Sequence, residues 1–202
     1  MATRGMLHLN GNLLCAVDVE TTGLEPGFHE VWQVGILALD SNIKPAKNIL
    51  PFYVNLKISY PERIEPKAIR NRTAFALLQQ RALDPFSAAD LLDSWFERLQ
   101  LPIYKKICPL AQNFPFDRSH LIEWLGIKNY EYLFSPWYRD TMTTAIFDSD
   151  LCNFRGEKIM FTEYGLAFLC NKLKVHNEKP HDALQDCVAT AECYRRLLLR
   201  GV

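Results

Sequence analysis

An apolar run that ends in two acidic residues is the strongest constraint in this sequence. Residues 13–17, Leu-Leu-Cys-Ala-Val, lead into Asp18 and Glu20, and residues 21–23, Thr-Thr-Gly, then form a turn signal. An uninterrupted apolar run of this length bounded by a turn predicts a buried strand. Alternate side chains of a strand share one face, so Asp18 and Glu20 are expected side by side, with Cα atoms about 6.5–7 Å apart.

Two carboxylates at the edge of a core admit two interpretations. They repel each other and lose hydration, which costs free energy unless a cation compensates. A hard divalent cation held by oxygen ligands would supply that compensation. The alternative is a strand end that frays into solvent, where both carboxylates stay hydrated, because acidic residues are usually exposed. This pair of residues alone leaves both interpretations open.

The composition is that of one folded domain. The 202 residues, 49% of them hydrophobic, fit a single domain over residues 1–202 with a substantial core. No apolar run approaches the roughly 18 residues that span a bilayer, and no secretory signal follows the first residues. The sequence therefore predicts a soluble, cytoplasmic protein without a membrane partner.

Charge and cysteine usage narrow the function classes further. The 23 basic and 23 acidic residues balance, which argues against coating nucleic acid by bulk charge but not against gripping one chain end. The six cysteines contain no Cys-x-x-Cys pair and no zinc-finger spacing. We expect reduced core cysteines, and we regard thiolate catalysis as the weaker alternative because no cysteine lies in an evident electropositive setting.

The expected elements are those of an α/β domain. Short connections between the opening strand and strands at residues 31–39 and 49–58 favour an antiparallel meander. A fourth strand is expected at residues 105–111, and residues 148–158 have the polar composition of a loop. Helices are expected from Pro66, over 85–99, over 117–125 with Gly126 as the stop, over 140–147, over 162–173, and after the capping-box spacing of Asp182 and Gln185.

Three further residues at element ends could contribute to a site. Asp117 follows the fourth strand, and Asp186 lies in the first turn of the last helix, with His181 shortly before it. Taken singly, both aspartates fit a helix start, where the macrodipole favours an acidic residue. A lone histidine such as His181 is more often a surface loop residue than a base.

Together these segments resemble the three motifs of the DEDDh 3′–5′ exonucleases, which include polymerase proofreading subunits and oligoribonucleases. Residues 18–23 resemble the first motif, Asp-Val-Glu-Thr-Thr-Gly. Residues 113–117, Asn-Phe-Pro-Phe-Asp, with Leu121 after them, resemble the second. Residues 181–190 resemble the third, with its histidine five residues before the aspartate. The motifs come in the family's order and extend over nearly the whole chain.

The resemblance implies an α/β, ribonuclease H-like fold, with a central mixed five-stranded sheet whose second strand is antiparallel, flanked by helices. His181 would be the general base. Thr21 and Thr22 would lie against the terminal nucleotide, partly through backbone groups. Asn113 would contact substrate and support the second motif, with Phe116 acting through packing. Four carboxylates would bind two divalent metal ions, Mg²⁺ or Mn²⁺: Asp18, Glu20, Asp117 and Asp186.

The chemistry of phosphodiester hydrolysis needs these residue types. Two metal ions about 3.5–4 Å apart generate a nucleophile and stabilise the leaving oxygen. Four carboxylates offset most of their charge, and a histidine has a pKa near the operating pH. The predicted function is therefore a metal-dependent 3′–5′ exonuclease that acts on a single-stranded 3′ end, with DNA somewhat favoured over RNA, and releases nucleoside 5′-monophosphates.

Several alternatives stay open beside this function. The enzyme could act on short RNA, as oligoribonucleases do, or cut internally, although the spacing of His181 and Asp186 argues against internal cutting. A catalytically silent module that binds nucleic acid or a protein is also conceivable on this fold, although all five matched positions are intact. A polymerase or another replication or repair protein is a candidate partner, and both a monomer and a homodimer are compatible with the sequence.

One residue departs from the family's second motif, and one basic segment lies outside the three motifs. Gln112 stands where many family members have a histidine, which puts a second-motif role of that side chain in doubt. Four basic residues in one segment, three of them at helical spacing, could contact phosphates of the incoming strand, but we favour a plain solvated face for them at zero net charge. They are Arg63, Lys67, Arg70 and Arg72.

Overall fold

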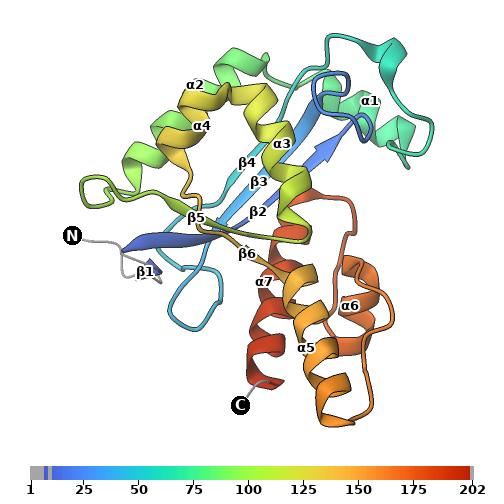
Figure 1. Ribbon diagram of the computed structural model, residues 1–202. Coiled ribbons are helices and arrows are strands. Elements are labelled where there is room, and N and C mark those ends of the chain that lie inside the picture. The colour runs from blue at the N-terminus through green and yellow to red at the C-terminus, as the bar shows by residue number, and fades with distance from the viewer. Residues whose placement is uncertain (1–6, 9–10, 201–202) are drawn as a thin grey trace.

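A mixed β-sheet forms the centre of the protein (Figure 1). The structure, a computed structural model, describes residues 7–8 and 11–200. The strands are β1 (Leu7–His8), β2 (Asn12–Thr21), β3 (Val31–Ala38), β4 (Phe52–Asn55), β5 (Ile107–Ala111) and β6 (Arg139–Asp140).

The order and direction of the strands confirm the predicted sheet. The order is β4-β3-β2-β5-β6, and the two-residue β1 pairs with the start of β2 outside that order. β3 is antiparallel to both β2 and β4, whereas β5 is parallel to β2 and β6 is parallel to β5. The first three long strands therefore form the expected antiparallel meander, and the sheet is mixed with its second long strand reversed.

Helices cover both faces of the sheet (Figure 1). A 3₁₀ turn at Pro61–Arg63 precedes them. The helices are α1 (Arg72–Gln79), α2 (Pro85–Arg98), α3 (Phe114–Leu125), α4 (Ile127–Leu133), α5 (Thr141–Arg155), α6 (Leu166–Leu173) and α7 (Ala183–Arg200). α2, α3 and α4 lie on one side of the sheet, and α7 lies on the other with α5 and α6 packed against it.

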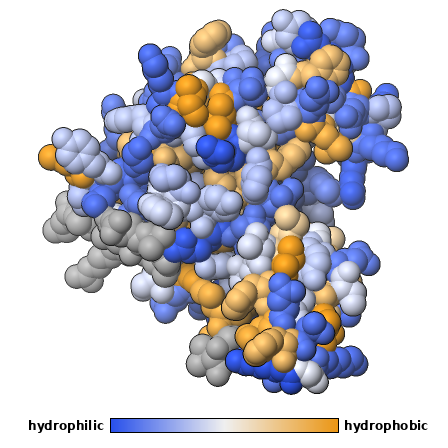
Figure 2. Space-filling view, viewed as in Figure 1, coloured by the Kyte–Doolittle hydropathy of each residue, from blue (hydrophilic) through white to orange (hydrophobic). Residues whose placement is uncertain are grey.

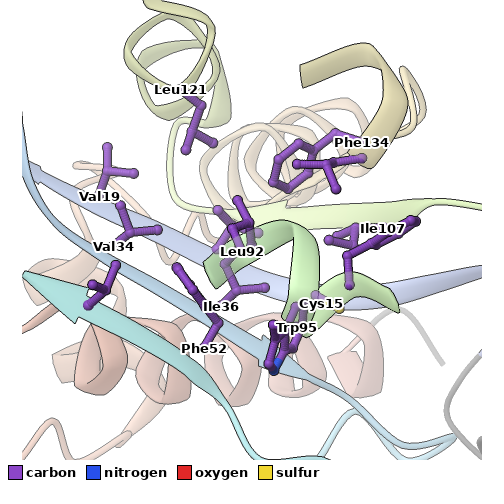
Figure 3. Close-up of a cluster of buried hydrophobic side chains, with 14 of the residues drawn as sticks. Cys15, Val19, Val34, Ile36, Phe52, Leu92, Trp95, Ile107, Leu121 and Phe134 are labelled. Atoms are coloured by element: carbon purple, nitrogen blue, oxygen red, sulfur yellow. The ribbon is translucent and has the colours of Figure 1, made fainter. Parts of the chain in front are cut away.

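The side chains of β2 alternate between the two layers. Leu13, Cys15 and Val17 belong to the apolar cluster that β2 shares with α2, α3 and α4 (Figure 3). Leu14 and Ala16 belong to the cluster that includes residues of α7. A strand buried on both faces explains why this run is apolar without alternation. The same alternation turns Asp18 and Glu20 to the face that α7 covers.

The surface and the cysteines agree with the composition. All six cysteines are buried, as predicted for core residues. Apolar side chains are visible in the lower part of Figure 2. On α5, Phe147 and Phe154 are 65% and 89% exposed. No helix within residues 7–8 and 11–200 is long and apolar enough to cross a membrane.

The helix predicted from Pro66 is wrong. The residues after it form a turn, and α1 begins only at Arg72. The segment before Pro66 is attached instead to the turn that follows β2, because the N–H of Glu65 donates to the carbonyl of Thr22 at 2.9 Å. The Asn71 side chain then caps α1 by accepting from the N–H of Ala74 at 2.9 Å. The three residues at helical spacing, Arg63, Lys67 and Arg70, therefore do not lie on one helix.

The loop predicted for residues 148–158 is also wrong, because α5 continues to Arg155 and ends at Gly156 with a φ of +69°. Burial explains the difference: Ser149 and Cys152 face the interior, and the Ser149 hydroxyl donates to the carbonyls of Ala145 and Phe161 at 3.1 and 3.3 Å. Packing thus overrides a polar composition. The other expected elements exist with shifted ends: the third and fourth strands are shorter, α3 begins at Phe114, and α6 begins at Leu166.

Gly35 on β3 lets the start of α7 approach the sheet closely. A Cβ at Gly35 would lie 2.7 Å from the carbonyl carbon and oxygen of Ala183. The Ala183 N–H donates to the Gln33 side chain at 2.8 Å, and the Cys187 thiol donates to the Gly35 carbonyl at 3.3 Å. Gly35 is also the cross-strand partner of Asp18. The first turn of α7 is therefore held directly over the acidic end of β2.

Replacing Gly35 with Ala should push α7 away from β3. We expect Gly35→Ala to lower the free energy of unfolding by about 1–3 kcal/mol, because the added methyl group meets backbone that cannot shift freely. Urea unfolding measures this loss. Gly165→Ala is the control, since a Cβ at Gly165 meets nothing within 4 Å and its effect should be smaller. Equal losses in the two variants would contradict the close approach.

Candidate active site

Three elements bring the predicted acidic residues to one place. Asp18 and Glu20 lie at the end of β2, Asp117 lies in the first turn of α3, and Asp186 lies in the first turn of α7. Asp18 is close enough to the other three carboxylates for each of their charges to raise its pKa. β2 continues past both acidic residues to Thr21, paired with β3. The frayed-strand interpretation is therefore wrong.

Backbone groups fix the orientation of Asp117. Its Oδ1 accepts a hydrogen bond from the N–H of Val19 at 3.0 Å, so the residue between Asp18 and Glu20 binds the third carboxylate. Asp117 is 3% exposed. The turn before it needs Asn113 in the left-handed region, with φ at +63°, and the Phe114 N–H donates to Asp140 at 2.6 Å. The second motif is thus attached to β2 and to the end of β6.

Asp186 is held by the loop that precedes its own helix. Its Oδ1 accepts from the Asn177 side chain at 2.5 Å, and its Oδ2 accepts from the backbone N–H of His181 at 3.1 Å. One side-chain ligand atom from each of Glu20, His181 and Asp186 lies within 4.8 Å of the others, a spacing that one cation could bridge. The structure therefore brings together all five residues that the sequence nominated for catalysis.

Burial raises the pKa values of these carboxyl groups. The pKa values of Asp18 and Asp117 lie well above their usual range because both are buried, and neighbouring carboxylates add to the effect. Burial, with the charges of Asp186 and Asp182, raises the pKa of Glu20 to about 7. Burial also raises the pKa of Asp186. A divalent cation would offset this repulsion, and the oxygen donors suit Mg²⁺ or Mn²⁺.

His181 is exposed beside this cluster, in a left-handed backbone conformation with φ at +66°. Burial of part of the ring, together with the charge of Arg70, lowers its pKa, and Asp186 opposes the shift. The imidazole is therefore neutral near pH 7 and can accept a proton.

A hydrogen-bond network that the sequence did not reveal holds the next residue, Asp182. Its Oδ2 accepts from the Tyr53 hydroxyl at 2.9 Å and from the Lys179 ammonium at 2.7 Å. Gln33 donates to the Tyr53 oxygen at 2.9 Å. The capping-box spacing identified Asp182 as a helix cap, and it does accept from the Gln185 N–H at 3.3 Å. Nothing in the sequence pointed to Tyr53, Gln33 or the Asn177 contact with Asp186.

The two threonines of the first motif organise the turn beside the cluster. The Thr21 hydroxyl donates to the Gly23 carbonyl at 2.6 Å, and the Thr22 hydroxyl accepts from the Glu30 N–H at 2.9 Å. Thr22 is fully buried. Both side chains are therefore already engaged within the protein, so any substrate contact from Thr22 would depend on other atoms of the turn.

Gln112, which replaces the histidine of many relatives, is also engaged within the protein. Its amide donates to the Tyr164 carbonyl at 2.6 Å and its oxygen accepts from the Thr141 hydroxyl. Gln112 thus joins the end of β5 to the start of α5 and to the segment before α6. The Gln112 side chain therefore helps to hold these three segments together.

A pocket of about 230 Å³ opens beside Glu20 and His181. Its lining is partly apolar, with Trp32, Ile69 and Phe75, and partly charged. The indole of Trp32 and the ring of Phe75 meet edge to face, with centroids 5.1 Å apart. The pocket therefore has an apolar wall next to Glu20 and His181.

A model of the exonuclease family, RNase_T, matches residues 15–194. No match was found among the curated proteins. Among solved structures, the fold is similar to that of cell-death related nuclease 4, CRN-4, at 16% identity and a TM-score of 0.70, over 94% of this chain and 64% of that one.

Two more solved structures share the fold. The nuclease domain of 3′hExo, described as a DEDDh family member bound to rAMP, has 17% identity and a TM-score of 0.65, over 94% of this chain and 93% of that one. The E. coli ExoI–ssDNA complex in its zinc-bound form has 19% identity and a TM-score of 0.71, over 94% of this chain and 41% of that one. The chain thus spans less than two thirds of the CRN-4 and ExoI chains.

The raised pKa of Glu20 predicts how stability depends on pH without metal. The folded protein keeps a proton on Glu20 up to about pH 7, whereas the unfolded chain releases it near 4.5. The stability linked to that proton is full below the lower value and is lost as pH rises through the upper one. In EDTA, the free energy of unfolding of Glu20→Gln should therefore rise by about 1–3 kcal/mol relative to that of the unsubstituted protein as the pH rises from about 5 to about 8.

Urea unfolding at several pH values measures this difference. Parallel pH curves for the two proteins would contradict the raised pKa. Adding Mg²⁺ should stabilise the unsubstituted protein more than Glu20→Gln, because the variant lacks one carboxylate that a cation would offset.

Proposed function

We propose that this chain, which belongs to the RNase_T exonuclease family, is a metal-dependent enzyme that hydrolyses the phosphodiester bond at the 3′ end of a single strand. Its products would be nucleoside 5′-monophosphates. One observation carries the proposal: carboxylates from β2, α3 and α7 converge, with His181 next to Glu20 and Asp186. Four carboxylates with raised pKa values, half-buried on β2 and buried on α3 and α7, support an enzyme over a silent binding module.

The carboxylates fit divalent metal ions. They are half-buried or buried oxygen donors that repel one another, and a hard cation would stabilise them. When bound, two such ions would supply an activated water and stabilise negative charge on the leaving oxygen. The residues that would hold them are Asp18, Glu20, Asp117 and Asp186.

The chain's own groups would then bind the strand and move a proton. His181 is exposed at the site, and its lowered pKa keeps an imidazole nitrogen available to accept the proton of the attacking water. The pocket beside Glu20 would receive the terminal base against Trp32, Ile69 and Phe75. Only an unpaired end offers a base that can enter such a recess, which supports a single-stranded substrate.

The choice between DNA and RNA as the substrate is a more specific part of the proposal. We take single-stranded DNA as the favoured substrate and short RNA as the alternative. Among structures of the same fold, one is a complex with ssDNA and another is bound to the ribonucleotide rAMP. A polymerase partner and the oligomeric state stay predictions from the resemblance.

The decisive test is a cleavage assay with 5′-labelled single strands of DNA and RNA of equal sequence. With Mg²⁺ or Mn²⁺ we expect a ladder that shortens from the 3′ end, with DNA degraded faster, and no cleavage in EDTA. Asp18→Asn should abolish the ladder, because it removes one charge from the proposed metal site. A single internal product would support endonuclease activity instead, and no cleavage with either metal would contradict the proposal.

His181→Ala separates a general base from a metal ligand. As a base, His181 should contribute about 10²–10⁴-fold to kcat, so the variant should lose that factor while its affinity for Mn²⁺, measured by calorimetry, is unchanged. His176→Ala is the matched control, since His176 is an exposed histidine of the same loop. A loss of metal affinity in His181→Ala would instead make His181 a ligand.

A further inference from the structure

Arg70 lies exposed in the lining of the pocket that contains Glu20 and His181. Within residues 7–8 and 11–200, no hydrogen bond or ion pair joins its guanidinium to another side chain. Its backbone is anchored on both sides, because Ile69 is only 6% exposed and Asn71 caps α1. An unpaired cation is thus held at the edge of an acidic cluster.

The structure distinguishes Arg70 from the other basic residues of its segment. The guanidinium of Arg63 stacks on the Tyr60 ring, 3.9 Å from its centroid, and faces the Phe28 ring at 5.0 Å. Lys67 and Arg72 line an outer hollow together with Arg70, but they do not line the pocket with Glu20. Of these four residues, only Arg70 lines the pocket that contains Glu20 and His181.

The charge of Arg70 acts on two residues of the proposed catalytic centre. It favours the charged form of Glu20 and disfavours the charged form of His181. Lys179 also lines the pocket, but it is already paired with Asp182 at 2.7 Å. In the proposed reaction the phosphate would lie beside the carboxylates and His181, and Arg70 lines the same pocket as Glu20 and His181.

The charge balance of the site leaves a role for such a cation. Four carboxylates and two divalent ions sum to zero, so a phosphodiester would add an uncompensated negative charge, and a further one develops during hydrolysis. We propose that Arg70 binds a phosphate oxygen of the substrate strand at the mouth of the acidic cluster. This inference rests on the proposed function and adds a substrate contact to it.

An arginine suits this position better than a lysine. The guanidinium can donate two parallel N–H bonds to two oxygens of one phosphate, whereas an ammonium group acts as a point charge. The contact would bind every strand regardless of base, because phosphate contacts carry no sequence information. It would also make binding more sensitive to salt.

The test measures equilibrium binding, which does not require turnover. A 5′-fluorescein single strand with phosphorothioate linkages at its 3′ end is titrated with the full chain in Mg²⁺, by fluorescence anisotropy, at salt concentrations from about 50 to 200 mM. We expect Arg70→Ala to bind about 10-fold more weakly. The slope of log K against log salt should become shallower by about 0.7, the value for one phosphate contact on a single strand.

Two further variants make the result specific. Arg70→Lys should recover the salt slope but only part of the affinity. Arg72→Ala, an exposed arginine two residues away, should bind like the unsubstituted protein. Equal affinity and slope for Arg70→Ala and Arg72→Ala would overturn the assignment and make Arg70 a solvated cation.

The assay also separates this failure from a failure of the proposed function. If the unsubstituted protein binds and degrades the strand while Arg70→Ala matches Arg72→Ala, only the Arg70 contact is refuted. If the unsubstituted protein neither binds nor degrades any strand, both proposals are refuted. Thermal unfolding of Arg70→Ala should match that of the unsubstituted protein, because the side chain is exposed.

Discussion

The contact between the first turn of α7 and Gly35 on β3 is the constraint on which the candidate site depends. Because Gly35 pairs with Asp18 across the sheet, a helix that touches Gly35 must pass over Asp18. A side chain at position 35 would separate the two layers, since its Cβ would lie 2.7 Å from the Ala183 carbonyl. The absence of a single Cβ therefore brings Asp186, from the far end of the chain, to a carboxylate near its beginning.

That close approach is opposed by electrostatics. The four carboxylates repel one another in a buried place, as the raised pKa values of Asp18 and Asp117 indicate, so the metal-free cluster destabilises the fold around it. Directed hydrogen bonds hold it against that repulsion: the Val19 N–H on Asp117, and the Asn177 side chain with the His181 N–H on Asp186. These donors face the carboxylates from the backbone and from a loop, so they favour the charged forms that a cation needs.

The sequence predicted what depends on local order, and it missed what depends on distant partners. The two-sided burial of β2 and the antiparallel meander follow from patterns within a few residues, whereas the set of four carboxylates followed from the resemblance of three separate motifs to one family. The bond from Tyr53 to Asp182 joins residues 129 positions apart, so no local pattern could reveal it. The extension of α5 to Arg155 was missed for a related reason, because the buried positions Ser149 and Cys152 are not recognisable as such from a polar stretch.

The fold links the position of His181, the proposed base, to the position of Asp186, a proposed metal ligand. The loop before α7 is attached at three points: Asn177 and the His181 N–H both bind Asp186, and Asp182 is bound by Tyr53 from β4. The imidazole is thereby positioned through a bond from its own backbone to a carboxylate of the cluster. Any movement of Asp186 that accompanies metal binding must move the backbone of His181 as well. If His181 is the base, as proposed, it would be aligned with the site only when Asp186 is, so the geometry of proton transfer would follow the geometry of metal binding.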